Sequence, residues 1–116
     1  MERALFYEYL IRAVYKCGRT NKHGADADIY RWMLSVSDRF PNMENREYKL
    51  GVMVGKVSAH LSEALGEAIS LYGNNLEFKA KIEKCVSYLN EPTVEKLNNC
   101  VDETWEAFTE IGLKAE

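Results

Sequence analysis

The chain has 116 residues, of which 47% are hydrophobic and 28% charged. These values are typical of a folded protein and argue against extended disorder. No apolar run approaches the roughly 18 residues that a membrane-spanning helix needs. We therefore expect one helical domain over residues 1–116 that does not enter a membrane.

The net charge of −3 conceals an uneven distribution along the chain. Residues 1–58 carry ten Lys or Arg against seven Asp or Glu, whereas residues 59–116 carry five against eleven. A charge polarised in this way can orient a charged partner during association. The distribution therefore favours a binding role.

The three cysteines, Cys17, Cys85 and Cys100, are widely spaced and lie among apolar residues. An odd number with this spacing is typical of small buried thiols in a reducing compartment. The residues after Met1 lead directly into an amphipathic helix and show no cleavage pattern of a signal peptide. These observations predict a cytoplasmic protein.

The first predicted helix spans residues 2–17, because apolar side chains cover more than half of its helical wheel. Gly18 follows as a natural stop, and a polar loop over residues 18–24 comes next. Basic residues cluster around this turn and form a candidate anion-binding site: Lys16, Arg19 and Lys22.

The second predicted helix begins near Asp26 or Asp28, whose carboxylates suit a helix N-terminus. It ends before Pro41, because the residue before a proline is disfavoured in the α region. Trp32 lies on the apolar face of this helix, so we expect its indole to be buried.

Residues from about 43 to 72 predict one long helix with Asn42 as its cap. A heptad stripe of apolar residues follows one face: Leu50, Val54, Val57, Leu61, Ala64, Ala68 and Leu71. A second stripe, roughly 150° away on the wheel, holds only small residues: Gly51, Gly55, Ala59, Ser62, Gly66 and Ser70. Two such stripes predict a central helix with neighbours on both sides.

The length of this helix adds a constraint. A helix from Asn45 to Tyr72 extends over about 42 Å, but a globule of this chain length is only roughly 35 Å across. The helix must therefore bend, protrude or pack against a second subunit. Each interior glycine costs about 1 kcal/mol relative to alanine, and close approach of a neighbouring helix is the simplest compensation.

Two further helices complete the chain. Tyr72 and Gly73 end the long helix, and Asn74 with Glu77 predicts a capping box at the start of the next helix. Pro92 predicts the first turn of a fifth helix, whose apolar stripe includes Trp105 and predicts burial of that side chain. No segment alternates with period 2, so the fold class is all-α: a compact bundle of four to five helices around residues 43–72.

Signatures of catalysis are missing from the sequence. His23 and His60 are the two histidines, and neither has the neighbours of a metal site, so we expect no metal. There is no phosphate-binding loop, no dinucleotide motif and no pairing of a nucleophile with a base. We therefore expect a protein without a cofactor that is not an enzyme.

The segment from Ala59 to Gly66, with His60 on the polar face of the long helix, resembles the histidine-phosphotransfer family of helical bundles. The resemblance implies a phosphorylated histidine at His60. The family's lysine three residues after the histidine is Glu63 here, and its glycine is Ala64. A glutamate repels a phosphoryl group that a lysine attracts.

Five acidic residues face water on the last helix and form the candidate partner-binding site: Glu95, Asp102, Glu103, Glu106 and Glu110. Only Lys96 offsets them. We interpret the chain as a non-enzymatic protein–protein interaction module, an adaptor, regulator or inhibitor of a larger protein with a basic surface. Small acidic helical proteins of this kind include phage and viral inhibitors, an analogy at the level of class.

Alternatives remain open. A nucleic-acid-associated domain would use the basic turn together with Arg31 and Arg46, although few aromatic residues accompany that turn, which disfavours nucleic acid as a partner. A homodimer through the first and third predicted helices is another alternative, and phosphotransfer through His60 is a third.

Overall fold

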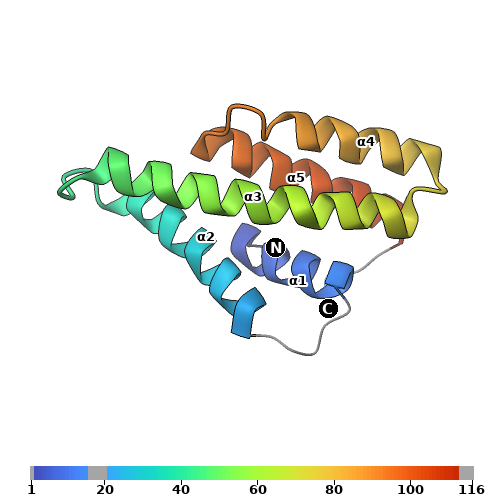
Figure 1. The fold of residues 1–116 in the computed structure, drawn as a ribbon, viewed down its shortest axis with the longest axis horizontal. Coiled ribbons are helices and arrows are strands. Elements are labelled where there is room, and N and C mark those ends of the chain that lie inside the picture. Colours follow the sequence, from blue (N-terminus) through green and yellow to red (C-terminus); the bar gives the residue numbers. More distant parts are fainter. Residues whose placement is uncertain (1, 16–20, 113–116) are drawn as a thin grey trace.

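The computed structural model describes the backbone of residues 2–15 and 21–112 and the side chains of residues 2–11 and 28–112. Over these residues the chain forms five α-helices and no strand, which confirms the predicted all-α bundle (Figure 1). The helices are α1 (Arg3–Tyr15), α2 (Asn21–Arg39), α3 (Arg46–Tyr72), α4 (Leu76–Ser87) and α5 (Val94–Glu110). None of these described helices combines the length and apolarity needed to cross a membrane.

Helix α3 is the centre of the bundle and contacts each of the other four helices. Figure 1 shows α3 running along the length of the molecule, with α1 and α2 on one side and α4 and α5 on the other. The molecule measures 46 × 29 × 22 Å and has a radius of gyration of 14.0 Å. Helix α3 is about 40 Å long, which is shorter than the longest dimension of the molecule. The length of α3 alone therefore does not require a second subunit.

The starts of α2 and α3 differ from the prediction in position. Helix α2 begins at Asn21, five to seven residues before the predicted aspartates, so it includes part of the predicted polar loop. Helix α3 begins after Asn45 and not at the predicted cap Asn42. Asn45 has a φ of 54°, a left-handed conformation that asparagine tolerates better than most residues.

Side-chain caps start α4 one residue later and α5 two residues later than predicted. The Asn75 side chain accepts a hydrogen bond from the Phe78 N–H at 3.0 Å, so Asn75 and not Asn74 is the cap of α4. The Thr93 hydroxyl accepts from the Lys96 N–H at 3.1 Å. Pro92 therefore precedes the cap of α5 and is not in its first turn.

The apolar stripe of α3 is buried as predicted over most of its length. Val54, Val57, Leu61, Ala64 and Ala68 all belong to the core, together with residues from every other helix. At one end of the bundle, aromatic rings join α1, α3, α4 and α5 in one cluster: Phe6, Tyr72, Phe78, Trp105 and Phe108. These contacts hold α4 and α5 on one side of α3.

The small-residue stripe of α3 is exposed, which contradicts the predicted second buried face. All six of its residues face solvent. A Cβ atom built on Gly51, Gly55 or Gly66 would meet no neighbouring atom within 4 Å. Small residues fit both a close helix crossing and open solvent, and the sequence pattern alone could not separate the two.

The two tryptophans also differ from each other. Trp105 is partly buried and stacks on Phe6, with ring centroids 5.7 Å apart. Trp32 is 54% exposed, so the prediction that its indole is buried is wrong. An exposed indole points to an interaction site where further exposed apolar residues lie beside it.

Candidate protein-binding surface

Trp32 forms part of an apolar groove between α2 and α3. Ile29 and Trp32 come from α2, and Val52 and Met53 come from α3. The groove has a volume of about 370 Å³, and Asp28 and Lys56 complete its lining. We call it the Trp32 groove. Its apolar walls and charged edges suit an apolar side chain of a protein partner.

The groove continues into an uncharged face of α3, which we call the open face. It consists of exposed residues that lie within about 100° of each other on the helical wheel: Tyr48, Gly51, Val52, Gly55, Ala59, Ser62, Gly66 and Ser70. Tyr48 is 76% exposed and Val52 is 41% exposed. Val52 belongs to both surfaces, so the groove and the open face are continuous.

Charged residues lie along one edge of the open face, which we call the charged flank. Lys49 and Lys56 occupy the N-terminal half of α3, and Glu63 and Glu67 occupy the C-terminal half. All four side chains are exposed. The two signs of charge are thus separated along the helix axis.

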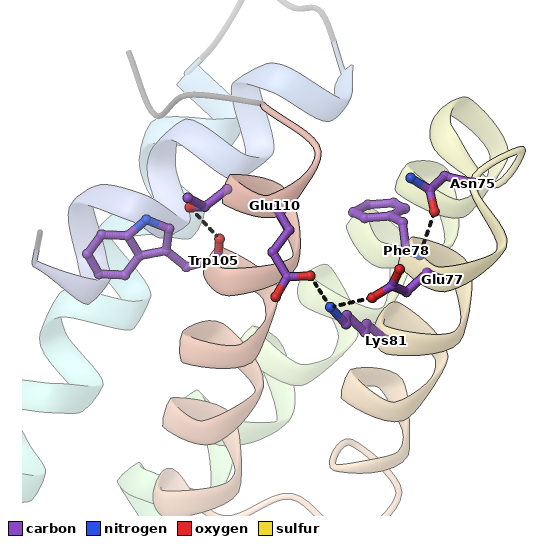
Figure 2. A network of polar contacts seen from close by, with 7 residues as sticks. Asn75, Glu77, Phe78, Lys81, Trp105 and Glu110 are labelled. Atoms are coloured by element: carbon purple, nitrogen blue, oxygen red, sulfur yellow. Dashed lines mark hydrogen bonds and ion pairs between the residues drawn. The ribbon is translucent and has the colours of Figure 1, made fainter.

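The acidic residues of α5 are partly neutralised within the molecule. Asp102 forms an ion pair with Arg3 of α1, and Glu103 lies 3.2 Å from the Lys84 ammonium of α4. Figure 2 shows Lys81 of α4 between Glu77 and Glu110, and the hydrogen bond with Glu110 raises the pKa of Lys81. The sequence reasoning counted charges on α5 alone and therefore missed the lysines of α4.

Two acidic residues of α5 remain exposed without such neutralisation. Glu95 and Glu106 have no ion pair with any described residue. A partner-binding role of the acidic face stays a prediction, but most of its charge is already matched inside the bundle. The residues of the open face and Trp32 are instead exposed to solvent. The Trp32 groove and the open face are therefore the stronger candidate for a partner-binding surface.

The predicted basic site falls largely outside the described residues. Lys16 and Arg19 lie outside them, and Lys22 lies in α2 where the structure does not describe side chains. Of the two further arginines, Arg31 forms ion pairs with Glu8 and Asp28. Arg46 donates a hydrogen bond to the Ser37 carbonyl at 3.0 Å. Both arginines thus make polar contacts within the molecule.

His60 is partly buried on α3, between the exposed residues Lys56 and Glu63 in sequence. Phosphotransfer through His60 stays a prediction. Among the residues whose side chains the structure describes, 2–11 and 28–112, no cluster of three or more metal-binding groups is present.

The described cysteines are buried, as expected. Cys85 and Cys100 are free thiols in the core. Burial raises the pKa of the Cys100 thiol to about 12 and also raises that of Cys85. Both thiols are therefore protonated and unreactive near neutral pH. Cys17 lies outside the described residues.

Comparison of the chain with protein-family models, curated proteins and solved structures gives no match. The candidate surface therefore depends on the geometry of this chain. The sequence analysis missed Trp32 and Val52 as surface residues, because it assigned Trp32 to a buried apolar face and placed Val52 in neither stripe of the long helix.

Proposed function

We propose that the protein is a non-enzymatic protein–protein interaction module that binds a protein partner through the Trp32 groove and the open face of α3. One observation carries the proposal: an indole that is 54% exposed borders an apolar groove of about 370 Å³. Tryptophan is the residue most enriched where partner proteins gain binding energy. A regulator or adaptor needs such a surface and no catalytic group.

The charges around the groove support a protein partner. Asp28 and Lys56 carry opposite charges and line the groove together with four apolar residues, a composition that suits an interface core with a polar rim. A small-molecule site would be more enclosed and would carry polar groups that converge on the ligand.

A capture experiment with matched variants tests the proposal. Wild type, Trp32→Ser and Leu76→Ser are each immobilised and exposed to a lysate of the source organism that also contains untagged copies of this chain. Leu76 is the control, because it is 76% exposed and lies at the start of α4, away from the groove. Quantitative mass spectrometry then compares the retained proteins.

We expect wild type and Leu76→Ser to retain a protein that Trp32→Ser does not retain. This protein is either a protein of the source organism or an untagged copy of the chain. Titration of the purified partner should then quench or shift the Trp32 emission. Equal retention by all three baits, or retention of nothing by wild type, would contradict the proposal.

A further inference from the structure

We propose that the open face of α3 binds the same face of a second copy of this chain, with the two α3 helices antiparallel. This inference rests on the proposed function, because it names the partner of that surface. The order of charges along the charged flank carries it.

The charged flank is complementary to itself only in the antiparallel orientation. In an antiparallel pair related by a two-fold axis, the same flank of both helices meets and the N-terminal half of one faces the C-terminal half of the other. The lysines of one copy then face the glutamates of the other. In a parallel pair related by a two-fold axis, the flanks of the two copies lie on opposite sides of the interface, so the lysines of one flank do not meet the glutamates of the other.

The register follows from placing the two-fold axis at Ala59, in the middle of the open face. Lys56 then lies within one residue of the level of Glu63 of the second copy. Lys49 lies within two residues of the level of Glu67, or about 3 Å along the axis. A lysine side chain spans that distance, so each copy contributes two lysine–glutamate pairs.

The same register matches small residues with small residues. Gly51 lies within one residue of the level of Gly66 of the second copy, and Gly55 within one residue of the level of Ser62. Such positions let two helix backbones approach closely, as interior Gly and Ser residues do at helix crossings. The space above Gly51, Gly55 and Gly66 is empty to at least 4 Å within this molecule.

The size of the surface predicts a weak dimer. A helix face about 40 Å long and about 11 Å wide covers roughly 440 Å², less than the roughly 800 Å² per partner of a standard interface. The Trp32 groove beside the charged flank adds apolar area. We therefore expect a dimer that forms with rising concentration and weakens with salt.

Charge-swap variants test the inference by sedimentation equilibrium at low salt over a wide concentration range. Lys56→Glu and Glu63→Lys each place like charges across the axis, so each should weaken self-association about tenfold or more. The double variant Lys56→Glu/Glu63→Lys restores complementarity and should dimerise like wild type. A mixture of the two single variants should form a heterodimer, because one flank is then acidic and the other basic. Lys79→Glu on α4 is the control for net charge, since Lys79 is exposed and far along the chain from the flank.

The outcomes separate this inference from the proposed function. The antiparallel pair is supported if wild type dimerises, each single variant dimerises more weakly, and a mixture of the two single variants dimerises again. A monomer at every concentration, or single swaps that dimerise as tightly as wild type, would overturn it. If the wild-type chain is monomeric but captures a protein from the lysate that the Trp32→Ser variant does not capture, the proposed function stands and this inference fails. Circular dichroism of each variant confirms that the fold is intact.

Discussion

Arg3 and Asp102 form a bidentate ion pair although 99 residues separate them. The Arg3 Nε and Nη2 atoms donate to the Oδ1 and Oδ2 atoms of Asp102, both at 2.9 Å. The pair joins the start of α1 to the middle of α5. The hydrogen bond with Asp102 raises the pKa of Arg3, so the guanidinium stays charged. Both side chains are more than 40% exposed, so solvent screens the attraction.

We expect a measurable but small coupling between these two residues. A double-mutant cycle with Arg3→Gln and Asp102→Asn should give about 0.5–1 kcal/mol in the free energy of unfolding, as for exposed pairs with good geometry. Urea unfolding measures each variant. Glu106→Gln is the matched control and should change the free energy of unfolding by less. A coupling of zero would mean that solvent competes fully for the pair.

Replacing an exposed glycine of α3 should stabilise the isolated chain. Gly55→Ala at low protein concentration should raise the free energy of unfolding by about 0.5–1 kcal/mol, because alanine favours helix and its Cβ meets nothing within 4 Å. Gly73→Ala is the contrast and should destabilise, because its Cβ would lie 2.3 Å from the Ile69 carbonyl oxygen. Thermal unfolding compares the two variants. Destabilisation by Gly55→Ala would indicate that the stripe is covered.

Native fluorescence should report an exposed indole. Trp32 is 54% exposed, whereas Trp105 is partly buried against Phe6. Trp32→Phe should therefore move the emission maximum to shorter wavelength and reduce quenching by acrylamide. Trp105→Phe should leave both properties of the exposed indole in place. Unchanged quenching in Trp32→Phe would contradict the exposure of this side chain.

The stability of the fold should fall at alkaline pH. Burial raises the pKa of Cys100 to about 12, so above pH 8.5 or thereabouts the unfolded chain loses a proton that the folded chain keeps. The free energy of unfolding should drop by at most about 1.4 kcal/mol per pH unit from this group. Burial also raises the pKa of Tyr30, which adds to the loss at higher pH.

Urea unfolding at pH 7, 9 and 10 measures this dependence. Cys100→Ala should lower stability at pH 7, because it leaves a cavity, but should reduce the decline between pH 9 and pH 10. An equal decline in both proteins would indicate that Cys100 does not contribute.

The sequence predicted the helices because hydrophobic periodicity and breaker residues are local signals. The apolar stripe through Val57 and Leu61 is buried as its spacing indicated. Contacts between helices were not predictable from spacing. Lys84 neutralises Glu103 across α4 and α5, and such a pairing depends on how two distant helices are turned toward each other. The exposure of Trp32 depends in the same way on the angle at which α2 crosses α3.

The central position of α3 also has a consequence for hydrogen exchange. Helix α3 contacts helices on both of its sides, and Leu61 in its middle is buried in the core, so we expect the central amides to exchange only when the whole bundle opens. The slowest amides of α3 should therefore report the global free energy of unfolding. Amides at the two ends of the same helix should exchange faster through local fraying. Exchange rates along this one helix thus range from those set by local opening at its ends to those set by complete unfolding at its centre. The slowing of amide exchange by a bound partner can be compared with this range.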